Sequence, residues 1–388
     1  MHRFVTLYLS AFLLDALLSV AAQWLPIPAI QLTVAWIVFA ASALIYAAMA
    51  FYNRFPKRLL LPPALFLFWA GICGGFPLAF LELGDTELLL ACLQILLGIV
   101  LLGIHLRGDP TLPAMRRPAF SWRNLALFLA ANFILIPAGL AAAGINAVGV
   151  LAEQSTGGYI KLRRGGLMLE EREFQKGPKH VRLVSMMHIG DAHFYETIRQ
   201  SFLNTTSAVV LLEGVMDQNG LLHGRFSYDL LAQRLGLAAQ NMEQLTGGDS
   251  SGEASHPPAG TPATPDYRPA DVDIASFHPQ TIELLERMGR FLENPTLGAA
   301  LQTFASQDSP LQQPGVQELV KTDILDGRNA HLTAEIQQAL GEYDTVIVPW
   351  GALHLSELEA TLEAWGFQEI RQIDRPVIGF TGPRDPPH

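Results

Sequence analysis

The sequence predicts an N-terminal all-α transmembrane bundle of about five helices, followed by an α/β domain with a mostly buried sheet. Two observations carry this prediction. Residues 1–150 hold 8 Lys and Arg against 5 Asp and Glu, whereas residues 151–388 hold 18 against 31. Long apolar segments fill the first part, while short apolar runs alternate with amphipathic patterns in the second. We therefore expect a multi-pass membrane region over residues 1–151 and an α/β domain over residues 152–388.

The composition also excludes several classes of protein. Half of the 388 residues are hydrophobic and only 16% are charged, against about 25% charged in soluble domains. A disordered chain, a disulfide scaffold and an ordinary soluble enzyme are therefore excluded. The excess of acidic residues in the second part would repel phosphate, so we expect no nucleic-acid partner. Both cysteines, Cys73 and Cys92, fall in the first part, which leaves the second without a cysteine nucleophile.

Five apolar segments are long enough to cross a bilayer, because a helix of about 20 residues spans its hydrocarbon core. They cover residues 4–25, 30–51, 59–81, 88–106 and 125–151. The lipid bilayer is thus the first expected partner. Small residues end the first segment at Ala21 and Ala22, so this segment could instead be a cleaved signal peptide. Cleavage would leave four crossings and the same final side.

The charges between these segments predict their orientation. Basic residues follow the second segment (Arg54, Lys57, Arg58) and the fourth (Arg107, Arg116, Arg117, Arg123), while acidic residues follow the third (Glu82, Asp85, Glu87). Positively charged loops stay in the cytoplasm. We expect a multi-pass protein of the cell membrane with a cytoplasmic N-terminus and an extracytoplasmic C-terminal domain, which is periplasmic in a Gram-negative cell.

Asp15 lies in the middle of the first segment, and Pro62, Pro63 and Pro77 interrupt the third. An acidic residue within the membrane is a candidate functional residue, and broken helices can line a transport site. The alternative is that Asp15 makes a contact between helices.

The second part reads as alternating strands and helices. A hairpin with Gly165 and Gly166 at its turn is predicted over residues 159–174, followed by a strand over residues 181–187. Asp191 is the expected N-cap of the next helix. Residues 208–212 are an uninterrupted apolar run, which is typical of a parallel strand buried on both faces. Residues 246–269 are rich in Gly, Ser, Pro and Thr, and predict a flexible insertion.

The pattern of strand, histidine and helix occurs twice. After the insertion, helices are expected over residues 281–292 and from Gly327 onward. A strand over residues 345–348 then leads to a helix with Ser356 and Glu359 as its capping box, and residues 370–380 form the last strand. Residues 181–213 and 345–380 share this plan, which suggests internally paired strand–His–helix units.

Three residues stand where these strands end: His188, Glu213 and His354. The carboxyl ends of parallel strands meet at one edge of a sheet, where α/β folds place their sites. Two histidines and a carboxylate are a ligand set for a catalytic divalent metal, Mn, Co or Zn, which would activate a water. Asp191 and His193 are secondary candidates for this set. The alternative is that the histidines are surface residues and that Glu213 marks where its strand reaches solvent.

Arg328 is expected in the first turn of its helix, four residues before Leu332 on the inward-facing stripe. A buried guanidinium needs a carboxylate partner. Glu213 or a carboxylate of the substrate could supply one, which makes Arg328 a candidate catalytic residue beside His188, Glu213 and His354. A purely structural ion pair would satisfy the same need.

Four stretches of this region resemble the TraB/PrgY/GumN and Tiki superfamily: MMHIGDAHFYETI, VVLLEG, DGRNAHLTAEI and WGALHLSELEATLEAWGF. The resemblance covers residues 155–380. The second G-x-x-H motif is intact at Gly351 to His354, whereas Ser185 replaces the first glycine of the other. Glu213 and the pair Arg328 and Asn329 match the remaining marks. The resemblance implies an α/β fold with both histidine motifs facing one cleft. In the Tiki branch it implies divalent-metal-dependent peptide hydrolysis outside the cell.

The expected function is therefore that of a membrane-anchored, extracytoplasmic, metal-dependent hydrolase, with a peptide or protein as its substrate. Two alternatives remain. The first is a non-catalytic module of the same family that captures a peptide or another signal, which the substitution of glycine by Ser185 favours. The second is a transporter with a regulatory outer domain, which Asp15 favours.

Overall fold

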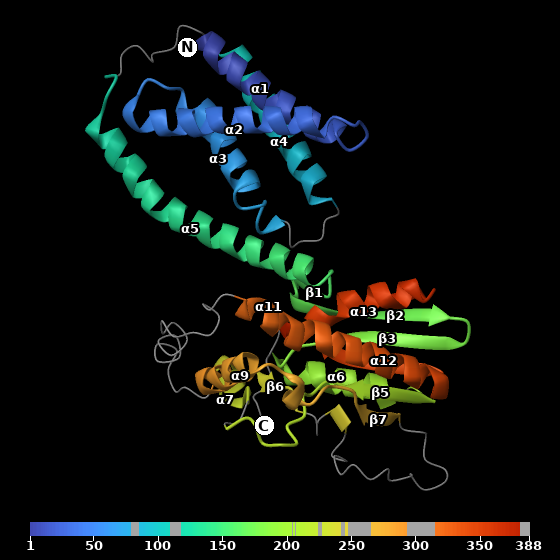
Figure 1. Ribbon diagram of the computed structural model, residues 1–388. Coiled ribbons are helices and arrows are strands. Elements are labelled where there is room, and N and C mark those ends of the chain that lie inside the picture. Colours follow the sequence, from blue (N-terminus) through green and yellow to red (C-terminus); the bar gives the residue numbers. More distant parts are fainter. Residues whose placement is uncertain are drawn as a thin grey trace. The chain divides into compact units, whose positions relative to one another are not determined.

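The computed structural model describes residues 1–78, 85–108, 118–203, 205, 207–223, 227–241, 245–246, 265–292 and 315–380. The chain divides into two compact units, Met1–Val150 and Leu151–His388. Figure 1 shows that the first unit is helical and that the second combines strands and helices.

The first unit contains the helices α1 (His2–Ala21), α2 (Pro28–Phe51), α3 (Lys57–Gly71), α4 (Thr86–Arg107) and most of α5 (Trp122–Ser155). Four of them, α1, α2, α4 and α5, are long and apolar enough to cross a membrane. In the part of the predicted third span that the structure describes, α3 continues through Pro62 and Pro63 and ends after 15 residues. Apolar helices of this length support an association with the lipid bilayer.

Asp15 links two helices of this unit. It is buried in α1, and its Oδ2 atom accepts a hydrogen bond of 2.8 Å from Nε2 of Gln94 in α4. The same Nε2 atom also donates to the carbonyl oxygen of Phe12 at 3.0 Å. Hydrogen bonds between polar side chains hold transmembrane helices together. The contact of Asp15 with Gln94 is of this kind.

The second unit is built on a mixed sheet of seven strands in the order β1-β2-β3-β8-β5-β7, with β9 paired to β2. Strands β3, β8, β5 and β7 run parallel, whereas β1 and β9 are antiparallel to β2 and β2 is antiparallel to β3. The strands are β1 (Ile160–Arg163), β2 (Gly166–Lys176), β3 (Lys179–Met186), β5 (Ala208–Leu212), β7 (Asp266–Pro269), β8 (Thr345–Gly351) and β9 (Gln368–Gly379).

In the described part of this unit, six helices and several short elements connect these strands. The helices are α6 (Ala192–Leu203), α7 (Asp229–Leu235), α9 (Pro279–Leu292), α11 (Val316–Lys321), α12 (Gly327–Glu342) and α13 (Ala352–Ala364). A short 3-10 helix, η3, spans Ile274–Ser276, and a π-helical turn, η5, spans Thr322–Asp326 between α11 and α12. The strands β4 (Ile189–Gly190) and β6 (Ala238–Ala239) form a separate two-stranded sheet.

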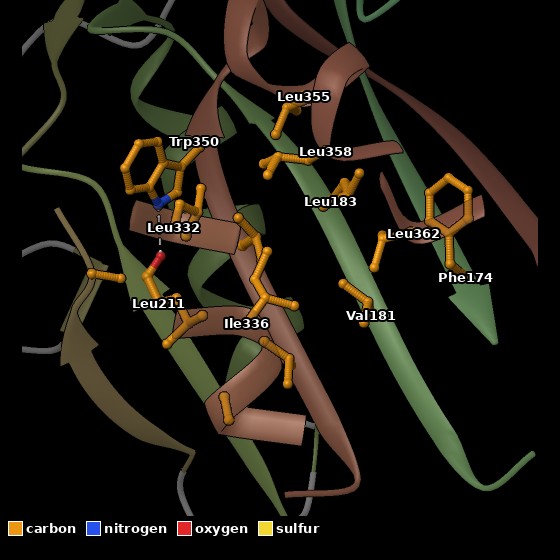
Figure 2. Close-up of a cluster of buried hydrophobic side chains, with 14 of the residues drawn as sticks. Phe174, Val181, Leu183, Leu211, Leu332, Ile336, Trp350, Leu355, Leu358 and Leu362 are labelled. Carbon is orange, nitrogen blue, oxygen red and sulfur yellow. Dashed lines mark hydrogen bonds between the residues drawn. The ribbon is translucent and has the colours of Figure 1, made fainter. Parts of the chain in front are cut away.

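Helices cover both faces of the parallel strands. Successive side chains of a strand point to opposite faces, so Val209 and Leu211 pack with α12 and α13, while Val210 and Leu212 pack with α6. Figure 2 shows the first of these clusters, in which Trp350 is fully buried and its Nε1 atom donates to the carbonyl oxygen of Leu211 at 3.0 Å. The run of residues 208–212 is buried throughout, as its unbroken apolar sequence predicts.

The predicted insertion is wrong at its C-terminal end. Residues 247–264 lie outside the described part of the chain, but Asp266–Pro269 form strand β7, which pairs in parallel with β5 from Val209 to Leu212. Four residues are too few for an alternating pattern to appear in the sequence. Pro269 is tolerated because β7 ends the strand order, and prolines occur on edge strands.

One predicted helix start is also wrong. Helix α13 begins at Ala352 with Gly351 as its N-cap, so Ser356 and Glu359 lie inside it rather than at its start. Glu359 forms an ion pair with Arg172 instead of a capping box. Before Gly327, the helical backbone already runs from Val316 through η5 into α12. Arg328 lies in the first turn of α12, as predicted, but a π-helical turn precedes that helix.

Candidate functional site

Three of the four parallel strands lead into one site at their carboxyl ends. Glu213 follows β5 directly, Asp271 follows β7 by two residues, and Gly351 ends β8. His354 follows in the first turn of α13. Arg328 and Asn329 approach from α12, and both are buried. We call these six residues, Glu213, Asp271, Arg328, Asn329, Gly351 and His354, the Arg328 cluster.

The guanidinium of Arg328 joins two carboxylates. Its Nε and Nη2 atoms donate to Oδ1 and Oδ2 of Asp271 at 2.9 and 2.6 Å, and Nη2 also donates to Oε1 of Glu213 at 2.9 Å. The side chain of Arg328 is 8% exposed and that of Asp271 is fully buried. Burial alone would lower the pKa of Arg328, but the hydrogen bond with Asp271 and the charge of Glu213 outweigh it and raise the pKa. The guanidinium is therefore a permanent cation held by a forked ion pair.

Backbone amides complete the hydrogen bonds of the two carboxylates. The Oε2 atom of Glu213 accepts from the N–H of Gly351 at 2.7 Å. The two oxygens of Asp271 accept from the N–H groups of Gly214 and Val272 at 3.0 and 2.9 Å. The ends of β5, β7 and β8 are thereby joined through two side chains. Because ionised groups in a buried site need such partners, these bonds offset the desolvation of the carboxylates.

The tautomer of His354 follows from a chain of partners. Glu357 is a carboxylate that only accepts, so Asn329 turns its Nδ2 atom toward it, at 2.5 Å from Oε2. The Oδ1 atom of Asn329 then faces Nδ1 of His354 at 2.6 Å, so Nδ1 carries the proton. The other ring nitrogen, Nε2, accepts from Nη1 of Arg328 at 3.2 Å. Burial, and then the charge of Arg328, lower the pKa of His354 to about 4. The ring is neutral at neutral pH.

The π-helical turn η5 shapes the approach of Arg328. A π turn widens a helix by one residue and is found at many functional sites. Here the carbonyl oxygen of Ile324 accepts from Nη1 of Arg328 at 3.4 Å. Asp323 anchors the same turn by accepting from Thr281 Oγ1 at 2.6 Å and from the N–H of His278 at 2.8 Å. Burial opposes these donors but they prevail, so the pKa of Asp323 is lowered.

His188 lies outside the Arg328 cluster. It is exposed and precedes β4, and the pairing of β4 with β6 brings it to Gln240, whose Oε1 atom lies 3.2 Å from Nδ1 of His188. The ring of His188 stacks on Tyr228, with centroids 4.7 Å apart. Burial, and then the negative charge of Glu213, raise the pKa of Tyr228. Tyr228 therefore contacts His188, and its pKa is also affected by the charge of Glu213.

The other two candidates have different partners. Asp191 stands directly before α6, as predicted for an N-cap, but its Oδ2 atom accepts from the N–H of Gly379 in β9 at 2.7 Å. His193 is exposed in the first turn of α6, and its carbonyl oxygen accepts from Thr197. Ser185 is buried in β3. Among the contacts of the described residues, none joins Asp191 or His193 to the Arg328 cluster.

A divalent metal does not fit the arrangement of these side chains. Across the described ranges, no three His, Cys, Asp or Glu residues are grouped as a metal site. Nε2 of His354 and Oε1 of Glu213 lie 3.8 Å apart, but both contact the guanidinium of Arg328. The lone pair that His354 would offer to a metal accepts an N–H of Arg328 instead. The cation of this site is therefore the guanidinium.

Three residues near the site carry no strong signal in the sequence: Asp271, Tyr228 and Gln240. Asp271 was hidden because it follows a strand too short to recognise. Once β7 is placed, an acidic residue at the carboxyl end of a parallel strand is the expected signal. Tyr228 directly precedes α7 and Gln240 directly follows the short strand β6, and no periodic pattern marks either position.

No family model, no curated protein and no solved structure matches this chain. The resemblance to the TraB/PrgY/GumN and Tiki superfamily thus rests on its motif residues alone.

Proposed function

We propose that this protein is a membrane-anchored hydrolase of peptides, of the TraB/PrgY/GumN and Tiki type, with the Arg328 cluster as its site. One observation supports the proposal above all. Glu213, Arg328 and Gly351 come from separate motifs, yet Glu213 hydrogen-bonds both of the others across separations of 115 and 138 residues. His354 joins the same network through Arg328, and its Nδ1 atom lies 2.6 Å from Oδ1 of Asn329. A set of motif residues that converges in this way is what a functional site requires.

The residues of the cluster would have distinct tasks. Hydrolysis needs a base for the attacking water. Glu213 is our candidate, because Oε1 accepts from Arg328 and Oε2 accepts from Gly351, while a carboxylate has about four acceptor positions. Arg328 and Gly351 would fix its orientation, and Asn329 would fix that of His354. His188 and Tyr228 would line the open side of the site, where a substrate would contact the exposed imidazole.

Metal dependence is the part of the resemblance that these side chains do not support. To bind a metal, Glu213 and His354 would both have to give up their hydrogen bonds with Arg328. A divalent metal, Mn, Co or Zn, remains an implication of the resemblance that direct analysis can test.

The membrane region supplies the remaining parts of the proposal. Four helices support anchoring in the bilayer. We further propose that α3 makes a fifth crossing, that the N-terminus is cytoplasmic, and that the second unit is extracytoplasmic. Within the second unit, the segments β3-α6-β5 and β8-α13-β9 would be the internally paired strand–His–helix units.

The test is turnover of a peptide library by the full-length protein in nanodiscs, read by mass spectrometry. We expect cleavage that Glu213→Gln reduces by at least 100-fold, in the range typical of removing a general base. Glu342→Gln is the matched control, because Glu342 pairs with Arg268 at the surface and lies outside the cluster. Equal cleavage by both variants, or none by the wild type, would reject the hydrolase proposal.

A second candidate is a non-catalytic module that captures an extracytoplasmic peptide or protein. One observation favours it: the strongest hydrogen-bonding groups of the cluster already bind one another, with Arg328 joined to Asp271, Glu213 and His354. Peptide binding that survives chelation, without turnover, would identify this function. The transporter alternative rests on Asp15 and on the prolines of the third segment, and the bond of Asp15 to Gln94 gives that acid a packing role.

A further inference from the structure

A cavity of about 460 Å³ lies outside the Arg328 cluster, between β2, β3, β9 and the end of α6. Its volume lies in the range of small-molecule sites, about 300–1,000 Å³. The ionisable side chains that line it are Arg182, Arg371, Arg375, His180, Glu171 and Glu173. None of these residues belongs to the motifs that suggest a hydrolase. The cavity is therefore an independent candidate site.

The charge balance of the lining is opposite to that of its surroundings. Three arginines face two glutamates in the cavity, whereas residues 151–388 as a whole hold 18 basic and 31 acidic residues. A concave site lined by one sign of charge concentrates ligands of the other sign. The excess of guanidinium groups points to an anionic ligand.

Glu171 neutralises only one of the two arginines that it binds. Its Oε1 atom accepts from Nε and Nη2 of Arg182 at 2.9 and 2.6 Å, and its Oε2 atom accepts from Nε and Nη2 of Arg375 at 3.1 and 2.8 Å. Burial would raise the pKa of Glu171, but the two arginines outweigh it and lower the pKa. Two cations therefore share one fixed anion, and one positive charge remains.

Arg371 is the third arginine of the lining and lies at an exposed position of β9, so that the arginines exceed the two glutamates by one positive charge. It lies opposite Glu173 in the register of β2 and β9, while Oε1 of Glu173 lies 3.1 Å from Nδ1 of His180. Arg371 and Arg375 are four residues apart on one strand, so they point to the same face with Cα atoms about 13 Å apart. Two side chains of this length can reach one ligand placed between them.

We propose that this cavity binds the phosphoryl group of a small organic molecule, held by Arg371 and Arg375. A phosphate monoester carries a charge of about −1.5 to −2 at neutral pH and accepts paired hydrogen bonds from guanidinium groups. It thus complements the excess charge of the lining, and the volume leaves room for the rest of the molecule. The phosphoryl group could belong to a soluble phosphomonoester or to a phospholipid headgroup, which share this chemistry.

The test is calorimetric titration of the full-length protein in phosphatidylcholine nanodiscs with glycerol 3-phosphate, at constant ionic strength set with KCl. We expect saturable binding that Arg371→Gln weakens by at least tenfold. Arg371 is exposed and leaves both ion pairs of Glu171 intact, so this variant should keep the thermal midpoint of the wild type. Arg287→Gln is the matched control, because Arg287 pairs with Glu283 on α9, away from the cavity. It should bind like the wild type.

A second arm identifies the source of the phosphoryl group. Nanodiscs that contain phosphatidic acid should raise the apparent Kd for glycerol 3-phosphate several-fold if the headgroup occupies the cavity, and should leave it unchanged if the ligand is soluble. Either result supports the site. The proposal is overturned if no saturable binding occurs in either lipid, or if Arg371→Gln and the wild type bind with equal affinity.

Discussion

The Nε2 atom of His354 lies 3.2 Å from a guanidinium nitrogen of Arg328, with both side chains buried. An imidazole so close to a permanent cation stays neutral, because protonation would place two positive charges in contact. Asn329 supports the same state by accepting the proton of Nδ1. This pair fixes the charge of the whole site, in which one cation faces the carboxylates of Asp271 and Glu213. This balance of charges should affect the stability of the fold, the dependence of that stability on pH, and the binding of metals.

His354 should make the fold sensitive to acid. Its pKa falls from 6.5 in the unfolded chain to about 4 in the folded one, so the unfolded state binds more protons between these values. Stability from this group is complete above pH 6.5 and is lost as the pH falls to about 4, by on the order of 3 kcal/mol. Thermal unfolding of the full-length protein in detergent should therefore depend less on pH in His354→Gln than in the wild type. Identical slopes between pH 4 and 7 would contradict this.

Much of the second unit was predictable because its strands are apolar runs with clear ends. Val209 to Leu212 shows this, and so does the hairpin around Gly166. The predictions that failed rested on local sequence signals that tertiary contacts override. The Ser356 and Glu359 pattern imitates a capping box, but Glu359 bonds Arg172 from a neighbouring strand. Helix α12 does begin at Gly327, but the helical residues from Val316 to Asp326 that precede it were not predicted.

The candidate site was likewise predictable only in part. Glu213, Arg328 and His354 were predictable because strand ends and an inward-facing arginine leave patterns in the sequence. Asp271 was not, since only the pairing of β7 with β5 reveals that it follows a strand. Parallel strand ends were expected to bring His188 to the others, but the pairing of β4 with β6 holds it at Gln240.

Removal of Arg328 should cost far more stability than removal of a surface arginine. Arg328→Gln leaves Asp271 and Glu213 without their cation in a buried site, which should lower the free energy of unfolding by about 3–5 kcal/mol. Arg287→Gln removes an exposed ion pair with Glu283 and should cost less than about 1 kcal/mol. Denaturant unfolding of both variants checks the difference. Equal losses would show that the ion pairs of Arg328 are not buried as described.

Arg328 should also control metal binding. With the guanidinium in place, we expect the dialysed wild-type protein to hold no stoichiometric Mn, Co or Zn. Arg328→Ala releases Glu213, Asp271 and Nε2 of His354 together, and two carboxylates with one imidazole are a zinc ligand set. This variant should bind about one Zn²⁺, and adding His354→Ala should abolish it. A wild-type metal that is lost in both His188→Ala and His354→Ala would instead support the metal implied by the resemblance.

Gln94 should matter to the bundle through its bond to Asp15. Gln94→Leu removes the donor and leaves a buried carboxylate unpaired, whereas Asp15→Asn keeps an acceptor oxygen for Gln94. Hydrogen bonds between membrane helices are worth about 0.6–2 kcal/mol. We therefore expect Gln94→Leu to lower the thermal midpoint in detergent and Asp15→Asn to change it little. The reverse order, or a transport phenotype confined to Asp15→Asn, would favour a functional acid.

The side of the membrane that the second unit occupies depends on whether α3 crosses. Its 15 residues rise about 22 Å, less than the hydrocarbon core of about 30 Å. If only α1, α2, α4 and α5 crossed, a cytoplasmic N-terminus would return the second unit to the cytoplasm and would place Arg107, Arg116 and Arg117 outside. Positively charged loops resist that side, so we expect α3 to cross with the residues that follow it. A periplasmic reporter fused after Leu151 should be active in a Gram-negative host, and one fused after Arg54 should be inactive. Inactivity after Leu151 would mean an even number of crossings and a cytoplasmic site.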